Sequence, residues 1–258
     1  MTAPTASPAS AGLTGRTALV TGATRGIGRA IAQRLGSDGA NVVVNYRASS
    51  EAAADQARQV VEEITRAGGH AVAAPGDVGR AADVADLFDA AERAFGGVDI
   101  LVNNAAMFAA APIEHLPEDV FDALVTTNLK SVYLTGRQAA SRLRDGGRVI
   151  NVSAGIPNGG VAFMGVYGAT KAGVETLTRS LAHQLGARQI TVNAIAPGPT
   201  DTAMLADEAR AMADQIIGST PLGRLGLPTD LADAVALLAS EDARWITGQV
   251  IGVNGGFE

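Results

Sequence analysis

Short runs rich in Val and Ile alternate with longer amphipathic segments along almost the whole chain. The runs are typical of buried strands and lie at residues 17–21, 41–45, 70–75, 99–103, 147–153, 190–197 and 248–253. The segments between them have helical periodicity, at residues 25–37, 50–67, 80–95, 117–144, 164–186 and 229–239. Such alternation predicts βαβ units with right-handed crossovers. We therefore expect an α/β fold, a Rossmann-type doubly wound parallel sheet of about seven strands with helices on both faces.

The chain has the length and apolar content of one large domain. It has 258 residues, of which 47% are hydrophobic, and no cysteine, so disulfides play no part. We expect a disordered tail at residues 1–14 and a single domain at 15–258. The net charge of −6 and the lack of a long basic run argue against nucleic acid or an anionic membrane as partner. No secretory signal or membrane span is found, which favours a cytoplasmic protein.

The segment "TGATRGIG" joins the first expected strand to the first expected helix. Its glycines, Gly22, Gly26 and Gly28, suggest a phosphate held at a helix N-terminus, where free backbone N–H groups and the helix dipole favour negative charge. The spacing is G-x-x-x-G-x-G, and no Lys-Ser or Lys-Thr follows as a nucleoside-triphosphate loop requires. The loop carries a cation, Arg25, instead.

A tyrosine and a lysine follow the fifth expected strand, which ends at Ser153. Tyr167 and Lys171 are four residues apart in the next helix and therefore share one face. An adjacent ammonium favours the ionised phenol and is expected to lower the pKa of Tyr167, making it a usable acid or base. The plainer alternative is a half-buried tyrosine beside a solvated surface lysine. The chain has only two lysines, Lys130 and Lys171, which weighs against coincidence.

These motifs together resemble the short-chain dehydrogenase/reductase family, from about residue 14 to the C-terminus. The matching segments, in order, are "TGATRGIG", Asp77-Val78, "NNAA" at 103–106, Asn128 in "TTNLK", Ser153, "YGATK" at 167–171 and "PGPTDT" at 197–202. The resemblance implies a hydride transfer between NAD(P)(H) and a ketone or secondary alcohol, with Tyr167 as general acid and base. It implies that Ser153 binds the reacting oxygen and that Lys171 holds the nicotinamide ribose.

Other roles implied by the resemblance have competing interpretations. Asn128 matches the fourth catalytic residue and a water path from Lys171, whereas a helix-interior Asn can also bond locally to backbone. Asp77 can accept from the adenine amino group, cap the next helix, or do both. The "NNAA" run departs from the usual Asn-Asn-Ala-Gly at Ala106, which adds a methyl group near the adenosine ribose. The expected cofactor-binding residues are Gly22, Thr24, Arg25, Gly26, Ile27, Gly28, Tyr46, Arg47, Asp77, Val78, Asn104, Ala105, Ala106, Tyr167, Lys171, Pro197, Gly198, Thr200 and Thr202.

The end of the second expected strand indicates which cofactor is bound. NAD-dependent relatives place an Asp or Glu there to bind the ribose hydroxyls. Tyr46 occupies that position here and Arg47 follows it. Arg25 and Arg47 can then hold the 2′-phosphate of NADP(H) from two sides, although both can also be ordinary surface arginines. NADP(H) is the preferred cofactor in this interpretation, and use of NAD(H) as well is left open.

The resemblance implies a small carbonyl or alcohol compound as substrate. The expected lining is Ser153, Ile156, Phe163, Tyr167, Met204 and Leu205, with a closing loop at about residues 200–225. This mostly apolar lining favours a hydrophobic or aromatic ketone over a polyol. Acyl-carrier-protein reductases resemble the chain too, but the places where many carry basic docking residues are Leu134 and His183 here. "LRDGGRVINVS" and "VVVNYR" resemble polyketide ketone reductases and some sugar dehydrogenases.

Two functions of other classes compete with this one: a noncatalytic dinucleotide sensor on the same fold, and a methyltransferase using a sulfonium cofactor. The sensor would not need Ser153, Tyr167 and Lys171 together, and the sulfonium cofactor of a methyltransferase has no pyrophosphate. The three histidines, His70, His115 and His183, have no metal-ligand spacing, so no metal site is expected. The helices at 117–144 and 164–186 and the "GQVIGVNGGFE" terminus resemble subunit contacts of the family, which implies a homotetramer.

Overall fold

A computed structural model describes residues 12–156, 161–203, 205 and 213–257. Its centre is one seven-stranded parallel sheet in the order β3-β2-β1-β4-β5-β6-β7. The strands are β1 Thr17–Val20, β2 Asn41–Tyr46, β3 His70–Pro75, β4 Val98–Asn103, β5 Leu143–Val152, β6 Thr191–Pro197 and β7 Val250–Val253. The order reverses between β1 and β4, and the carboxyl ends of the strands there form the crevice in which such sheets bind ligands. The predicted fold class is confirmed.

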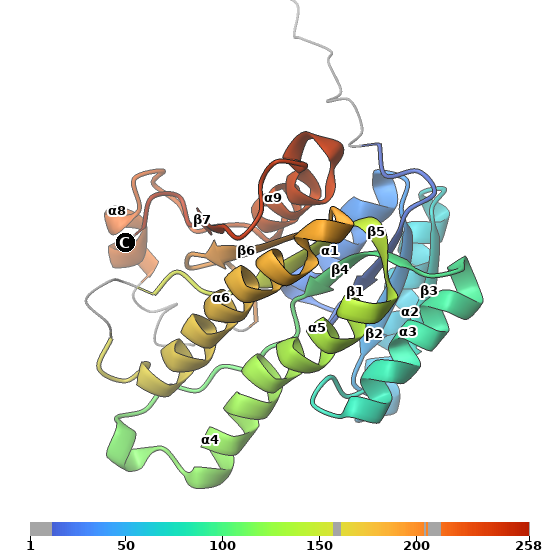
Figure 1. Cartoon of the computed structure of the whole chain (residues 1–258). Helices are drawn as coiled ribbons and strands as arrows, with labels where there is room; N and C mark the ends of the chain where they lie inside the picture. Colours follow the sequence, from blue (N-terminus) through green and yellow to red (C-terminus); the bar gives the residue numbers. More distant parts are fainter. Residues whose placement is uncertain (1–11, 157–160, 204, 206–212, 258) are drawn as a thin grey trace, which may run out of the picture.

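Helices cover both faces of the sheet, as Figure 1 shows. One layer consists of α1 Gly26–Ser37, α2 Glu51–Arg66 and α9 Pro228–Ala239; the other consists of α3 Ala81–Phe95, α5 Ser131–Arg142 and α6 Gly165–Leu185. In the figure, α5 and α6 run side by side in front of the sheet. Successive β1 residues face opposite layers: Leu19 packs in the α3–α5–α6 core and Val20 in the α1–α2–α9 core.

Helix ends carry the local signals that their sequences predict. Ser50 caps α2, and its hydroxyl accepts a hydrogen bond from the Ala53 N–H at 3.2 Å. Gly96 ends α3 in the left-handed conformation, at φ 79°. Pro228 opens α9, where the Asp230 carboxylate accepts from the Leu227 N–H at 2.7 Å.

The long helix predicted at residues 117–144 is interrupted. The chain forms α4 Glu118–Leu124, then a π-helical segment Val125–Lys130, then α5, and β5 already begins at Leu143. Leu143 pairs with Val98 before a register shift in the β4–β5 ladder, so sheet pairing ends the helix earlier than periodicity predicted. A wider turn within a helix is frequent at functional sites, and this one contains Asn128.

The remaining short elements are 3₁₀ turns at Ile113–His115, Gly186–Arg188 and Glu241–Ala243. The segment between β6 and α9 contains α8, Ala213–Ser219. Its two ends are joined, because the Asp201 N–H donates to Gly226 O and the Gly226 N–H to Pro199 O, both at 2.9 Å.

The structure also bears on the ends of the chain and on membranes. The predicted tail lies outside the described residues up to position 11. Leu13, however, is buried and its N–H donates to Asp38 O, so the packed chain already includes this residue.

Among the described helices, none has the length and apolar character needed to cross a bilayer.

Candidate active site

The glycine loop lies between the carboxyl end of β1 and the first turn of α1. Gly22 and Gly26 have φ of +60° and +52°, a region that favours glycine. A Cβ on Gly28 would lie 2.3 Å from Gly22 O and 2.4 Å from Asn104 Nδ2, so only glycine fits there. Arg25, the exposed N-cap residue of α1, supplies no side-chain cap to this helix end. The loop is therefore shaped to bring backbone N–H groups toward an anion.

Side chains from neighbouring strands hold this loop in place. Thr21 Oγ1 accepts from the backbone N–H groups of Asn104 and Ala105 at 2.9 and 3.0 Å. The Asn104 amide donates to Thr21 O and Gly22 O, and the Asn45 amide oxygen accepts from the Gly22 N–H. Asn104, which was predicted to bind the cofactor, uses its side chain in this structure to hold the glycine loop. Thr21 and Asn45 were missed by the sequence reasoning, because buried strand-end polar residues have no distinctive spacing.

A hollow lies at the ends of β2 and β3. Its lining residues are Arg47, Ala48, Ser49, Pro75, Gly76, Asp77, Arg80, Asp83 and Asp86. Two predicted residues, Arg47 and Asp77, therefore lie in one concave site, and Arg47 is exposed. One carboxylate oxygen of Asp77 accepts from the Gly79 N–H at 2.8 Å. Arg80 adds a second cation that the sequence reasoning did not select.

Further predicted cofactor residues lie around the glycine loop and the β6 end. Val78 and Thr200 are buried, whereas Thr24, Ile27, Tyr46, Ala106, Pro197 and Gly198 are partly exposed. Thr202 lies across the loop from Gly26, with its Cγ2 atom 3.5 Å from where a Gly26 Cβ would be. The segment after β6 therefore lies next to the glycine loop.

Ser153, Tyr167 and Lys171 lie together beside the end of β5. All three are buried, with exposed fractions of 3%, 8% and 3%. The Lys171 ammonium donates to Val152 O at 2.9 Å and lies 5.8 Å from the centre of the Tyr167 ring. Their one-face arrangement on α6 agrees with the prediction. The plain alternative of a solvated surface lysine does not apply, because Lys171 is buried.

The electrostatics of this pair differ from the expectation. Burial raises the pKa of Tyr167 to about 12 and lowers the pKa of Lys171 to about 8. The predicted lowering of the Tyr167 pKa is therefore not found in the ligand-free chain. The physical reason is that desolvation penalises both charged forms, and the ammonium donates to a neutral carbonyl rather than stabilising a phenolate. At neutral pH the phenol is protonated and able to donate.

Asn128 makes its contacts across the fold rather than within its own helix. Its amide oxygen accepts from the Met107 N–H at 2.9 Å, and its amide donates to Met107 O at 3.0 Å. The amide also donates to Thr170 Oγ1 at 3.3 Å. Asn128 thus ties the π-helical segment to the loop after β4 and to α6, next to Lys171.

The Ser153 hydroxyl has a partner that the sequence reasoning missed. It donates to Glu175 Oε1 at 2.9 Å, with a longer alternative contact to Lys171 O at 3.4 Å. Glu175 follows Lys171 by one turn of α6. A helical face extended one turn past the Tyr-x-x-x-Lys pair would have identified it.

The expected substrate lining is partly described. Ile156 is partly exposed, and its Cδ1 atom lies 3.1 Å from where a Gly168 Cβ would be, one residue past Tyr167. Phe163 is half exposed, and Leu205 is partly exposed. Met204 lies outside the described residues. Phe108, which sequence reasoning missed, packs edge-on against the Tyr167 ring with centroids 5.0 Å apart.

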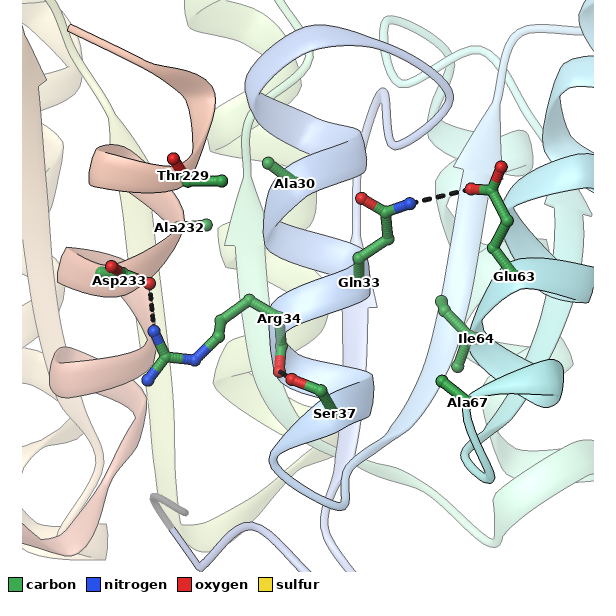
Figure 2. Close-up of a pocket in the computed structure, with 10 residues that line it drawn as sticks. All are labelled: Ala30, Gln33, Arg34, Ser37, Glu63, Ile64, Ala67, Thr229, Ala232 and Asp233. Atoms are coloured by element: carbon green, nitrogen blue, oxygen red, sulfur yellow. Dashed lines mark hydrogen bonds and ion pairs between the residues drawn. The ribbon is translucent and has the colours of Figure 1, made fainter. Parts of the chain in front are cut away.

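Figure 2 shows a second hollow, between α1, α2 and α9. An Arg34–Asp233 ion pair and a Gln33–Glu63 hydrogen bond span its sides. Its α1 residues, from Ala30 on, belong to the part of the helix that follows the glycine loop, so this hollow is separate from the site. Within the described residues, no three His, Asp or Glu side chains gather as metal ligands.

The chain resembles known proteins over nearly its full length. The family model described as enoyl-(acyl carrier protein) reductase matches residues 22–258. A versicolorin reductase from Emericella nidulans is 40% identical, over 95% of this chain and 96% of the relative. A 3-oxoacyl-[acyl-carrier-protein] reductase from Staphylococcus aureus is 41% identical, over 93% and 97%. The crystal structure of an angucycline C-6 ketoreductase with bound NADP has a TM-score of 0.88 at 41% identity, over 95% and 96%.

Proposed function

The chain belongs to the short-chain dehydrogenase/reductase family, and on this premise we propose that it reduces an apolar or aromatic ketone with NADPH. The observation that carries the proposal is the joint burial of Ser153, Tyr167 and Lys171 beside the end of β5. A noncatalytic dinucleotide sensor has no use for a desolvated ammonium next to a phenol. Burying a charged group costs free energy, and titratable groups perturbed in this way cluster at active sites.

Each of these side chains has a defined role in this proposal. Tyr167, protonated at neutral pH because burial raises its pKa to about 12, donates its proton to the carbonyl oxygen. Ser153 hydrogen-bonds and orients that oxygen. Lys171, fixed by Val152 O, holds the nicotinamide ribose and supplies positive charge as the phenol loses its proton. Asn128 positions the Met107 backbone and Thr170 next to this group.

The cofactor residues fit a dinucleotide with a 2′-phosphate. The glycine loop leaves no room for a Cβ at Gly28 and presents the N-terminus of α1 to the pyrophosphate. Arg47 lines a hollow with Asp77 and Arg80, and Tyr46 rather than an acidic residue occupies the end of β2, where NAD-dependent relatives place a carboxylate. Bound NADPH supplies the hydride that reduces the carbonyl carbon. The NADP-bound ketoreductase relative supports this cofactor choice.

The substrate class follows from the side chains near Tyr167. Phe108 packs against its ring, and Ile156 lies beside Gly168, the next residue in the chain. This apolar surface favours a hydrophobic or aromatic ketone over a sugar. The versicolorin reductase and angucycline ketoreductase relatives support the same class.

A second candidate is reduction of a 3-oxoacyl group on acyl carrier protein, which the Staphylococcus aureus relative favours. Two observations argue against it. At the two positions where many carrier-protein reductases have basic docking residues, this chain has Leu134, which is buried, and His183. The chain as a whole has a net charge of −6. An acidic carrier protein would meet little positive charge there.

A substrate panel tests the proposal. NADPH absorbance is followed with 1-tetralone and with acetoacetyl-CoA, and NADP⁺ reduction is followed with glucose. We expect a kcat/KM for 1-tetralone well above that for the other two substrates. Preferred turnover of acetoacetyl-CoA would support the carrier-protein reductase instead. Binding of NADPH without turnover of any substrate would support the dinucleotide sensor.

A further inference from the structure

Glu175 accepts a hydrogen bond from the Ser153 hydroxyl, which in the proposed reduction has to donate to the ketone oxygen. Ser153 Oγ donates to Glu175 Oε1 at 2.9 Å, and the alternative acceptor, Lys171 O, is farther away at 3.4 Å. The Glu175 side chain is 26% exposed, and its other oxygen lies 3.9 Å from the Arg179 guanidinium. Glu175 therefore links the helix surface to the buried hydroxyl.

A serine hydroxyl has one proton and two lone pairs. While Ser153 donates to Glu175, its oxygen can accept a hydrogen bond from a substrate alcohol, but it cannot donate one to a ketone oxygen. A carboxylate is an acceptor only, so it competes with the ketone for the same proton. The ketone form of the substrate therefore requires the Ser153–Glu175 hydrogen bond to break, whereas the alcohol form is compatible with it.

We propose that Glu175 is a positioning residue that acts through Ser153 and holds its proton away from an incoming ketone. This inference rests on the proposed ketone reduction. A ketone has to break the Ser153–Glu175 bond when it binds, and the bond is also broken in the transition state. A bound alcohol leaves the bond intact, because it donates to the Ser153 oxygen.

This mechanism predicts a specific division between kcat and KM when Glu175 is replaced by Ala. For 1-tetralone reduction, KM falls about tenfold, the size expected for a charge-assisted hydrogen bond, and kcat is unchanged. For 1-tetralol oxidation, KM is unchanged and kcat rises by the same factor, because only the transition state gains. Glu175→Gln, a weaker neutral acceptor of the same shape, gives a smaller change of the same kind.

The Ser153→Ala background tests whether Glu175 acts through Ser153. There, Glu175→Ala should leave KM and kcat in both directions unchanged within error, measured by single-turnover kinetics. Glu62→Gln is the matched control, because Glu62 is an exposed carboxylate on α2, which packs on β2 and β3. The inference would be overturned if Glu175→Ala had the same effect in the wild-type and Ser153→Ala backgrounds. It would also be overturned if Glu175→Ala alone left the kinetics of the otherwise wild-type enzyme unchanged.

A crystal structure of the NADP⁺-bound wild-type enzyme provides a readout that does not depend on turnover. Ser153 Oγ within hydrogen-bond distance of Glu175 is expected, and a hydroxyl turned away from α6 would overturn the inference. If wild type fails to reduce 1-tetralone, the proposed function is wrong while this structure still tests the bond. If wild type reduces it but the Glu175 and Ser153 effects are additive, only the role of Glu175 is wrong.

Discussion

At the residue scale, Lys171 combines a role in the site with a cost in stability. The residue is 3% exposed, and its ammonium donates a hydrogen bond to Val152 O. Burial lowers its pKa from 10.5 to about 8, so below pH 8 the folded chain carries a desolvated charge that the unfolded chain keeps in water. This depression, which already includes the hydrogen bond to the ammonium, corresponds to about 3 kcal/mol of lost stability at neutral pH.

Lys171→Met should therefore stabilise the ligand-free protein while abolishing turnover and weakening NADPH binding. At pH 7 the expected gain is about 2 kcal/mol, because Met removes the desolvated charge, at about 3 kcal/mol, but also the hydrogen bond to Val152 O, worth about 1 kcal/mol. This gain raises Tm by about 5 °C in a chain of this size. As pH rises from 8 toward 10.5, the folded wild type loses this proton before the unfolded chain does, so the difference shrinks. Calorimetry across this pH range measures it. A constant Tm difference, or a less stable variant, would contradict the account.

Arg25 and Arg47 carry the prediction about cofactor choice. Both are exposed, at the N-cap of α1 and directly after β2. Replacing both with Ala should raise KM for NADPH far more than KM for NADH, because only NADPH has the 2′-phosphate that the guanidinium groups can bind. The difference should shrink in high salt. Arg58→Ala, an exposed arginine paired with Asp55 on α2, is the control. Equal losses for both cofactors would show that these arginines do not recognise the phosphate.

At the element scale, the β1–α1 turn depends on close backbone contact. A Cβ on Gly28 would overlap Gly22 O at 2.3 Å, and neither that oxygen nor the Asn104 amide bonded to it can move without opening the loop. Gly28→Ala should weaken NADPH binding at least about tenfold, or about 1.4 kcal/mol, by cofactor fluorescence. Gly186→Ala meets nothing within 4 Å and should bind normally. Normal binding by Gly28→Ala in a folded variant would contradict this role for the turn.

The sequence predicted the elements better than it predicted their contacts. All seven strands and the glycine turn were predicted because β-branched runs and glycine spacing are local signals. The π-helical segment and the early start of β5 were missed, since both depend on pairing with distant residues such as Val98 and Met107. The Tyr167 pKa was misjudged for the same reason, because desolvation is a property of the assembled core. The Ser153–Glu175 bond was also missed.

At the scale of the whole molecule, the predicted homotetramer remains to be tested. Large apolar side chains are exposed in the region 117–144 and just before the terminus that the resemblance assigns to subunit contacts: Phe121, Tyr133 and Trp245. Light scattering should give the mass of four 26.1 kDa chains. Tyr133→Arg places a charge on a side chain that is 54% exposed and should yield smaller species, whereas Tyr133→Phe should not. A wild-type monomer would contradict the prediction.

The central claim is that Tyr167 delivers the proton during NADPH-dependent ketone reduction, and Tyr167→Phe tests it most directly. The substitution removes the transferable proton and keeps the ring that packs against Phe108. Single-turnover reduction of 1-tetralone at pH 7 should be nearly abolished, while NADPH affinity, titrated by fluorescence, stays within about twofold of wild type. A variant that keeps a tenth or more of the wild-type rate would contradict Tyr167 as the general acid.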